Sequence, residues 1–389
     1  MPRRMVITLL LSVYIALLGI GIIVPVMPVF ATDLGASGFG LGLIIAAFSI
    51  SRGLLQPMVG SLSDRWGRKR FLVSGLFVYT LIGLILPQAA SVGNLVLIRA
   101  LHGVGSAMIV PVAMAYMGDM AEEGKEGQAM SMLNIAIFCG IGTGPLVGGI
   151  FTDLWGMESA FYAMAALSGV ALILVLLQMP ASAEQTGVVR KMTLLQVMTS
   201  LLAGRRTRGI LLARMSTMII MVPTMAFLPL LMHQWFDASG LQIGLVIACR
   251  TFVNALLQTP FGRLADRRDK VWLLKIGCLV VSGVMCLVPL AGNFVCLLIL
   301  FAILGVGEAV IWPVLGALAT EEGRRYGQGS MMGIFNLAMS MGVLLGALGA
   351  GVSVDFLGLG PSFVIIGIVV LGLTFWAASL ISRDPVLIA

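Results

Sequence analysis

Apolar stretches of membrane-spanning length, separated by short polar segments, run along the whole chain. An α-helix needs about 20 residues to cross a bilayer, and twelve stretches reach that length. Six precede the single long polar segment and six follow it, so the pattern predicts domains at 1–180 and 208–389 joined by a linker at 181–207. The predicted spans are 5–30, 40–62, 71–91, 94–117, 127–151, 158–179, 208–232, 241–262, 271–291, 294–318, 329–352 and 359–381.

The pattern repeats itself halfway along the chain. Residues 42–68 recur as 244–270, at an offset of 202 residues (244 minus 42). An offset that stays fixed over half the chain indicates two parallel copies of one fold, an arrangement typical of transporters whose halves rock about a central site. The same offset relates residues further along, pairing Gly103 with Gly305, Pro111 with Pro313, Asn134 with Asn336 and Asp153 with Asp355.

Composition places these copies in a membrane. The chain is 59% hydrophobic and 11% charged, with a mean hydropathy of +1.06. Soluble domains average about 45–50% apolar and about 25% charged residues. The five cysteines all fall within predicted spans and form no CxxC pair, so we expect buried thiols without disulfides.

The positive charges predict an orientation. Of the 24 Lys and Arg, 20 lie at the termini, in even-numbered loops or in the first turn of the ninth span, while the outer loops hold only acids. Because cytoplasmic loops carry an excess of Lys and Arg, we predict a multi-pass protein of the inner (cytoplasmic) membrane with both termini cytoplasmic. This topology explains the net charge of +7 without nucleic acid as a partner.

A glycine- and arginine-rich segment joins the second and third predicted spans, and a partial copy follows the eighth. Glycines allow a tight turn and close helix approach, and Asp64 can face the positive N-terminal dipole of another helix. The copy carries Asp266 and Arg267 but lacks the second glycine, so we expect a weaker, partly symmetric contact there, against the start of the fifth span. The residues of the first segment that we assign to gating are Gly60, Asp64, Arg65, Gly67 and Arg68.

Two other spans carry glycine patterns. Closely spaced glycines in the fifth span form a groove in which another helix can pack, and Pro145 permits a bend. In the fourth span, Arg99 and His102 directly precede the pair Gly103 and Gly105. The pattern in the fifth span consists of Gly140, Gly144, Pro145, Gly148 and Gly149.

Together these segments resemble the signatures of the major facilitator superfamily, and the patterns in the fourth and fifth spans are similar to those of its drug:proton antiporter branch. The resemblance covers the whole chain and implies the major facilitator fold, an all-α integral membrane architecture of twelve transmembrane helices in two pseudo-symmetric six-helix bundles. It implies export, and it implies that Asp64 locks one side of the transporter against the eleventh span, which begins near Gly329 and Ser330. The chain departs from the branch at His102, where Gln is more common, and in the first span, which lacks an acid.

Four arginines (Arg52, Arg99, Arg214 and Arg250) and one acid, Glu308, lie in the interior of the predicted spans, beyond the first turn. An ionisable group at the bilayer centre costs about 2.5–3.5 kcal/mol, so each marks a candidate functional site. Helical spacing places several polar side chains on stripes that face the bundle interior or a water-filled cavity, although Arg214 is close enough to the span's end to reach the cytoplasmic surface. The predicted substrate-cavity residues are Tyr14, Arg52, Gln56, Arg99, Asn134, Arg214, Met218, Arg250, Asn254, Gln258 and Asn336.

Glu308 is the strongest candidate for proton coupling, because it is the only carboxylate near the middle of a span. Burial favours the neutral form of a carboxyl and a nearby arginine favours the charged form. A group held between these effects can gain and lose a proton during transport. The alternative is a permanent ion pair of Glu308 with Arg250 or Arg52. His102 is a second candidate, with an ordinary packed polar residue as its alternative.

The leading hypothesis is therefore a secondary active transporter, a proton-coupled exporter (antiporter) of amphiphilic small molecules that works by alternating access as a monomer. The excess of intramembrane arginine favours an alternative on the same fold, a flippase or exporter of anionic or zwitterionic lipid-like substrates. An enzyme is disfavoured, since the chain has two His, no HExxH segment and no pair of intramembrane carboxylates. No Walker loop is present, so we expect no cofactor and a proton gradient as the energy source. The duplication disfavours a channel.

Overall fold

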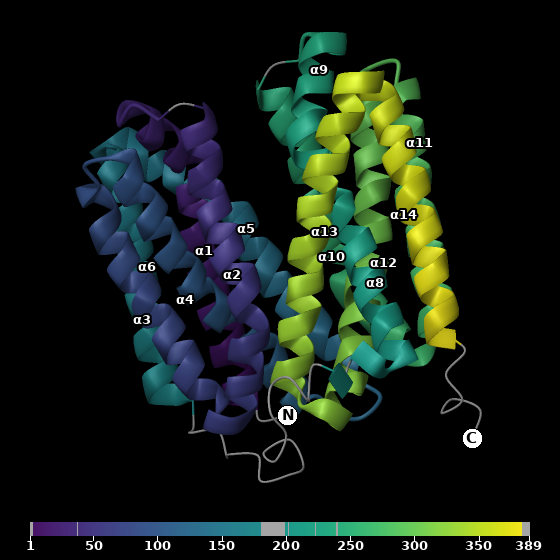
Figure 1. The fold of residues 1–389 in the computed structure, drawn as a ribbon, viewed down its shortest axis with the longest axis horizontal. Coiled ribbons are helices and arrows are strands. Elements are labelled where there is room, and N and C mark those ends of the chain that lie inside the picture. The colour runs from purple at the N-terminus through teal and green to yellow at the C-terminus, as the bar shows by residue number, and fades with distance from the viewer. Residues whose placement is uncertain are drawn as a thin grey trace. The chain divides into compact units, whose positions relative to one another are not determined.

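The structure is a computed structural model that describes residues 3–36, 38–179, 199–200, 202–221, 223–238 and 240–382. Within these ranges every regular element is a helix (Figure 1). Most of the predicted linker, 181–207, lies outside the described residues.

The elements of the first half are mostly long helices, and a 3-10 turn, η1, follows α3. They are α1 (Arg3–Asp33), α2 (Gly38–Trp66), α3 (Arg68–Ile85), η1 (Leu86–Gln88), α4 (Val92–Met120), α5 (Glu126–Trp155) and α6 (Met157–Gln178).

The second half repeats this series with one interruption. Its elements are α8 (Arg205–Ile219), the π-helical turn η3 (Pro223–Phe227), α9 (Leu228–Phe236), α10 (Gly240–Arg267), α11 (Lys270–Leu287), η4 (Val288–Leu290), α12 (Phe294–Tyr326), α13 (Gln328–Leu357) and α14 (Leu359–Ser382).

Element starts confirm the duplication read from the sequence. The helices α3 and α11 begin 202 residues apart (270 minus 68), and so do η1 and η4 and the pairs α2/α10, α4/α12, α5/α13 and α6/α14. The backbone repeats as well, because Gly156 and Gly358 have φ angles of 82° and 83°. The turn before α2 needs a positive φ at Gly35, and its equivalent Asp237 keeps one (82° and 48°), a conformation that Asp tolerates better than most residues.

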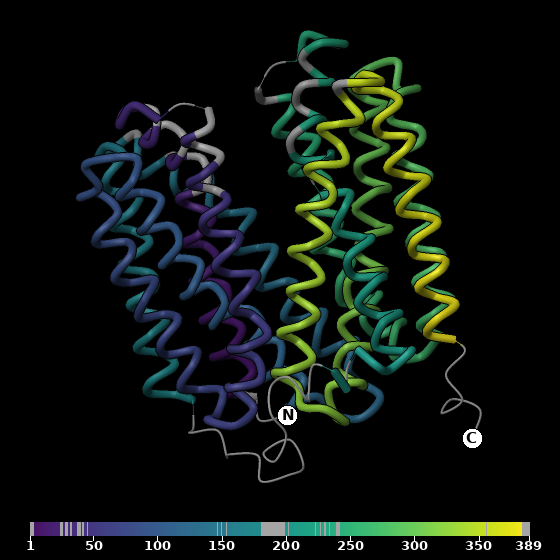
Figure 2. Tube along the Cα trace, in the orientation of Figure 1, coloured from purple at the N-terminus to yellow at the C-terminus, as the bar shows by residue number. Residues whose placement is uncertain are grey.

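The chain forms two compact units. Unit 1 contains the described residues of Met1–Glu122, Ile135–Val197 and Gly323–Asn336, and unit 2 those of Glu123–Asn134, Met198–Glu322 and Leu337–Ala389. Thus α5 and α13 each contribute to both units. Figure 2 shows the chain as a tube coloured from the N-terminus to the C-terminus. In unit 1, α4 packs against α2 and α3, and α6 packs against α1 and α3. In unit 2, α14, the equivalent of α6, packs against α8 and α11.

Ten described helices are long and apolar enough to cross a membrane. The two remaining predicted spans, 40–62 and 208–232, correspond to α2 and to the series α8, η3 and α9. The expectation of one unbroken helix at 208–232 is wrong, because the chain changes to a π-helical turn at Pro223. Proline lacks the backbone N–H that an α-helix interior uses, and π turns inside helices often occur at functional sites.

Glycines allow α1 and α5 to pack closely within unit 1, as the pattern in the fifth span predicted. A Cβ on Gly144 would overlap the backbone of Gly21 and Ile22, and one on Gly148 would meet the carbonyl of Ile22. A similar contact occurs in unit 2, where α13 packs against α8 through Gly342 and Gly346, the equivalents of Gly140 and Gly144.

We expect Gly144→Ala to destabilise the protein, because the added methyl group meets backbone, which cannot rotate away. Overpacking of this kind typically costs about 1–3 kcal/mol. Gly349→Ala in α13 is the matched control, since a Cβ there meets nothing within 4 Å, and it should leave thermal stability unchanged or slightly raised. Equal melting temperatures of the two purified variants would show that the α1–α5 contact is less tight than described.

Candidate functional site

The predicted gating segment is almost entirely helical. It was expected to be a loop between two spans, but α2 continues through Asp64 and Arg65 to Trp66, and α3 begins at Arg68. Gly67 alone connects them, with a φ of 88°. A side chain would be strained in that conformation, which explains the glycine.

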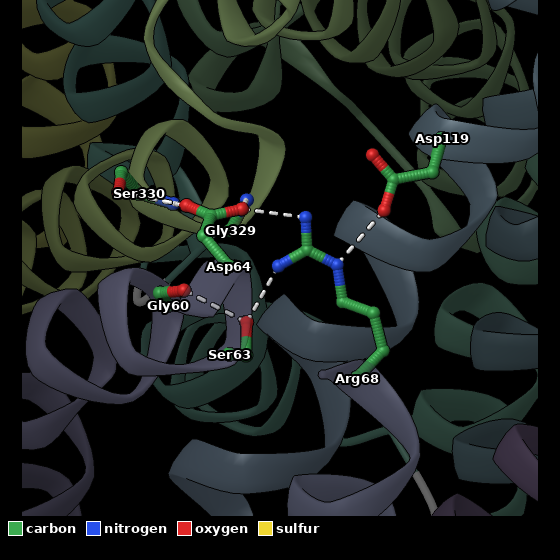
Figure 3. Close-up of polar contacts among 7 residues, drawn as sticks. All are labelled: Gly60, Ser63, Asp64, Arg68, Asp119, Gly329 and Ser330. Carbon is green, nitrogen blue, oxygen red and sulfur yellow. Dashed lines mark hydrogen bonds and ion pairs between the residues drawn. The ribbon is translucent and has the colours of Figure 1, made fainter. Parts of the chain in front are cut away.

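Asp64 binds the first residues of α13, as the resemblance implied (Figure 3). Its carboxylate accepts hydrogen bonds from the backbone N–H of Gly329 at 2.8 Å, from that of Ser330 at 2.7 Å and from the Ser330 hydroxyl at 2.8 Å. The Asp64 side chain is 0% exposed. A buried carboxylate at unpaired backbone N–H groups satisfies them and complements the positive end of the helix dipole.

Arg68 extends this contact to α4 (Figure 3). Its guanidinium donates to Asp64 at 2.6 Å, to the hydroxyl of Ser63 at 2.7 Å and to Asp119 at 2.9 Å. The Ser63 hydroxyl in turn donates to the carbonyl of Gly60 at 2.7 Å. Asp119 was absent from our sequence assignment, although the offset pairs it with another acid, Glu321, and that signal was available.

Glycine at position 60 is required for the contact between α2 and α13 in unit 1. A Cβ on Gly60 would collide with the backbone of Gly329 and Gly333. Arg65 lies half-buried near the end of the same helix.

The second copy of the segment repeats this contact in unit 2. Asp266 accepts hydrogen bonds from the backbone N–H of Gly127 at 2.6 Å and of Gln128 at 3.0 Å, at the start of α5. Lys270 and Glu321 form the counterpart of the Arg68–Asp119 pair, at 2.9 Å. Asp64 accepts three hydrogen bonds from α13 and is paired with the buried Arg68, whereas Asp266 accepts two from α5. The difference agrees in direction with the weaker second contact that we expect. Arg267 is exposed at the end of α10.

Glu308 in α12 forms a bidentate ion pair with Arg250 in α10, within unit 2. Arg250 Nε donates to one carboxylate oxygen at 2.9 Å and Nη2 donates to the other. Arg250 Nη1 also donates at 2.6 Å to the hydroxyl of Thr224, which lies in the π-helical turn η3. Asn254 adds a fourth hydrogen bond to the cluster, to Glu308 at 3.3 Å. Paired hydrogen bonds of this geometry are among the strongest that proteins make.

The polar stripe on α10 continues away from this pair. The Gln258 amide donates to Asn254 at 2.5 Å, and its oxygen accepts from Asn134 of α5 at 3.3 Å. The structure therefore joins Arg250, Asn254 and Gln258 into one chain of hydrogen bonds that ends at Asn134.

In unit 1 the equivalent stripe on α2 contains Arg52 and Gln56. In the orientation that satisfies both neighbours, the Gln56 amide accepts from Arg52 Nε at 3.1 Å and donates to the carbonyl of Asn336 at 3.2 Å. The Asn336 amide donates to the carbonyl of Met332 at 2.8 Å. Among the described residues, no carboxylate lies within ion-pair distance of Arg52.

His102 is completely buried in α4 and lies beside a cation. Its Nδ1 is 3.0 Å from Arg99 Nη1, and Arg99 also lies over the ring of Phe48, with 4.4 Å between Cζ and the ring centroid. The imidazole packs edge-on against Tyr79, with ring centroids 4.7 Å apart. Because arginine can only donate, Nδ1 must accept, and a protonated His102 would place two positive charges in contact. This geometry argues against His102 as the proton carrier.

Arg214 does not reach the surface, contrary to the alternative raised from the sequence. Arg214 is 3% exposed. Its guanidinium carbon Cζ lies 4.3 Å from the ring centroid of Trp312, and its Nη2 donates to Met339 Sδ at 3.1 Å. The aromatic face stabilises the charge inside unit 2, so snorkelling is unnecessary. Met218 is buried beside Gly342. Tyr14 of α1 is half-buried in unit 1, where its carbonyl lies against Gly140.

A duplicated all-α chain with ten helices long and apolar enough to cross a membrane is typical of solute transporters. The family model of the Major Facilitator Superfamily matches residues 9–234 and 209–388. The chain therefore belongs to this superfamily, and it is a transporter and not an enzyme.

Several curated proteins are similar to the chain. An uncharacterised MFS-type transporter of Methanocaldococcus jannaschii is 29% identical over 341 residues, covering 86% of this chain and 87% of that protein. Multidrug resistance protein 2 of Bacillus subtilis is 34% identical over 171 residues, covering 44% of this chain and 42% of that protein. The quinolone resistance protein NorA of Staphylococcus aureus is 27% identical over 187 residues, covering 48% of each. The matches span less than half the length of these two resistance proteins.

One solved structure, the human organic anion transporter MFSD10 (TETRAN), has a TM-score of 0.81 to this chain at 19% sequence identity, covering 97% of this chain and all of that one. At this identity the likeness shows the fold, and it confirms the predicted major facilitator fold.

Proposed function

We propose that the chain is a proton-coupled exporter of amphiphilic small molecules, in a cytoplasmic membrane with both termini on the cytoplasmic side. The observation that carries the proposal is the ion pair of Glu308 and Arg250. It supports the proposal because Glu308 is a carboxylate inside the long apolar helix α12, where Arg250 and Asn254 of α10 bind it. The resistance proteins among the relatives support export as the direction, and the Lys and Arg distribution supports the orientation.

The coupling step in this proposal is competition between a proton and Arg250 for Glu308. The ionised carboxylate binds Arg250 and so connects α12 to α10 and to the turn at Thr224. Protonation removes the negative charge, which weakens the pair and frees Arg250. The Glu308 side chain is 14% exposed, so the proposal has a partly accessible carboxylate for the proton. Because the pair lies within unit 2, its breakage loosens α10 against α12.

Asp64 and Asp266 provide the gate in the same proposal. Each binds the start of a helix that contributes to both units, α13 and α5 respectively. Release of these helix starts is the event that would open the cytoplasmic side in alternating access. The electrochemical gradient of protons supplies the energy, and a single chain suffices.

A flippase or exporter of anionic or zwitterionic lipid-like molecules is the second candidate. It is favoured by one specific observation, that Arg52 and Arg99 have no carboxylate partner among the described residues. In this second candidate the lipid moves passively, without a pH gradient, and this property distinguishes it from the proton-coupled exporter.

Reconstituted protein tests both. Proteoliposomes with an acidic lumen should accumulate norfloxacin, a fluorescent zwitterionic quinolone, faster than protein-free liposomes, and nigericin should abolish the difference by collapsing the gradient. Norfloxacin trapping in the protein-free liposomes corrects for passive entry. Equal uptake with and without protein, together with gradient-independent movement of a fluorescent phospholipid, would replace the exporter by the flippase.

A further inference from the structure

The two halves of the transporter carry their charges differently at equivalent positions. The acid Glu308 of α12 is equivalent to Ser106 of α4 (308 minus 106 is 202). The halves also exchange an arginine and a phenylalanine, because Arg250 is equivalent to Phe48, and Phe301 to Arg99. The second half thus holds a neutralised pair, and the first half holds cations without the equivalent acid.

The cations of unit 1 lie near a close approach of α2 to α4. Gly103 has no room for a Cβ because α2 approaches it at Phe48, Ser51 and Arg52. Both Arg52 and Arg99 are near enough to Tyr79 and His102 to act on them electrostatically. As whole residues, Arg52 and Arg99 are half-buried.

Four buried polar atoms at this place have no hydrogen-bond partner among the described residues: Arg99 Nε, His102 Nε2, the Tyr79 hydroxyl and the Ser106 hydroxyl. The Ser106 hydroxyl lies beside that of Tyr79 without forming a hydrogen bond of good geometry. All four can donate, because His102 accepts through Nδ1 and so carries its proton on Nε2. Buried polar groups are normally satisfied. The two nitrogens can only donate and both hydroxyls can donate as well, so an acceptor placed among them would satisfy all four.

We infer that the first half binds the anionic head group of an amphiphilic substrate, a carboxylate or a phosphate, between Arg52 and Arg99. The ligand's anion then does in unit 1 what Glu308 does in unit 2. The hydroxyls of Tyr79 and Ser106 and the imidazole N–H of His102 are the further donors to its oxygens. For its role in transport this inference rests on the proposed exporter: the proton would bind in the second half and the substrate anion in the first.

Polar donors are a more specific signal here than charge alone. A cluster that only fixed α2 against α4 would have its donors bonded to each other or to backbone, as in the Arg68 cluster, where Ser63 and two carboxylates satisfy the guanidinium. The Phe48 ring stabilises the charge of Arg99 but accepts no hydrogen bond from Tyr79 or Ser106. An anion is the ligand class that both neutralises the charge of the two arginines and accepts hydrogen bonds from the four donors.

Binding in lipid nanodiscs tests the inference without any proton gradient. The probes are dansylated undecanoate and its neutral amide, which have the same chain and fluorophore, and empty nanodiscs correct for partitioning. In phosphatidylcholine nanodiscs we expect the carboxylate to bind about tenfold more tightly than the amide, as charge-assisted bonds are stronger. Arg52→Gln and Arg99→Gln should each lower this preference, and Arg52→Lys should keep most of it.

Ser106→Glu is the decisive variant, because it supplies in the protein the carboxylate that the ligand would otherwise bring. It should abolish the preference for undecanoate while melting at a temperature equal to or above that of the wild type. If anionic phosphatidylglycerol in the nanodisc competes with the probe in the wild type but not in Arg52→Gln, the natural anion is a lipid; without competition it is a soluble amphiphile.

No preference for the carboxylate in the wild type, or an unchanged preference in the double variant Arg52→Gln, Arg99→Gln, would overturn the inference. These results do not depend on transport. A protein that prefers the carboxylate but does not respond to a pH gradient contradicts the proposed proton coupling and leaves the anion site intact.

Discussion

Glu308→Gln should abolish pH-gradient-driven accumulation of norfloxacin while the variant still binds it. Gln keeps the size of the side chain and one hydrogen-bond acceptor for Arg250, but it cannot change charge. Without a proton to exchange, the Arg250 contact no longer responds to pH. We expect accumulation to fall to the level of protein-free liposomes and norfloxacin affinity to change by less than about tenfold.

The same variant separates a proton carrier from a fixed ion pair. In a fixed pair, Gln would leave a buried cation without its counter-charge, which costs about 3–5 kcal/mol. Melting temperature and substrate affinity would then fall together with transport. Glu158→Gln, an exposed acid at the start of α6, is the matched control and should change none of the three measurements. A stable Glu308→Gln protein with full pH-driven transport would refute the assignment of Glu308.

The fold was predictable from the sequence because its main signals are long-range and regular. Membrane spans follow from apolar length, and the offset of 202 residues also fixed which helix of one half corresponds to which of the other. The same offset located Asp266 and its contact at the start of α5. It could have found Asp119 and Glu321 as well, since both are acids at equivalent positions at the ends of α4 and α12.

The parts that the sequence did not predict depend on local backbone geometry and on neighbours from other helices. The π-helical turn at Pro223 is a single local departure that apolar length cannot reveal, yet it carries Thr224, which binds Arg250. Arg214 looked close enough to the surface to extend there, and only the aromatic ring of Trp312, far along the chain, explains why it stays inside. In the sequence, Tyr79 is an ordinary residue of an apolar helix face. Only the structure shows that its ring packs edge-on against His102.

Asp64→Asn should release the start of α13 from α2 in unit 1. The change removes the negative charge and places an NH2 group against the N–H groups of Gly329 and Ser330, so that donors face donors. It also deprives Arg68, whose side chain is 4% exposed, of one of its two acidic partners. We expect the contact to lose between ~2 kcal/mol, as for a partly buried helix-dipole contact, and about 3–5 kcal/mol, as for a broken buried ion pair.

Hydrogen exchange measures this contact directly, because the two amides that Asp64 accepts from are backbone groups. Exchange in the peptide containing Gly329 and Ser330 should become at least about tenfold faster in Asp64→Asn, since each 1.4 kcal/mol corresponds to a factor of ten. Asp266→Asn is the matched control: it should accelerate exchange at Gly127 and Gln128, by a smaller factor, and leave Gly329 protected. If exchange at Gly329 and Ser330 is unchanged in Asp64→Asn, the acid does not hold α13, and only its place in a basic segment that orients the protein in the membrane remains.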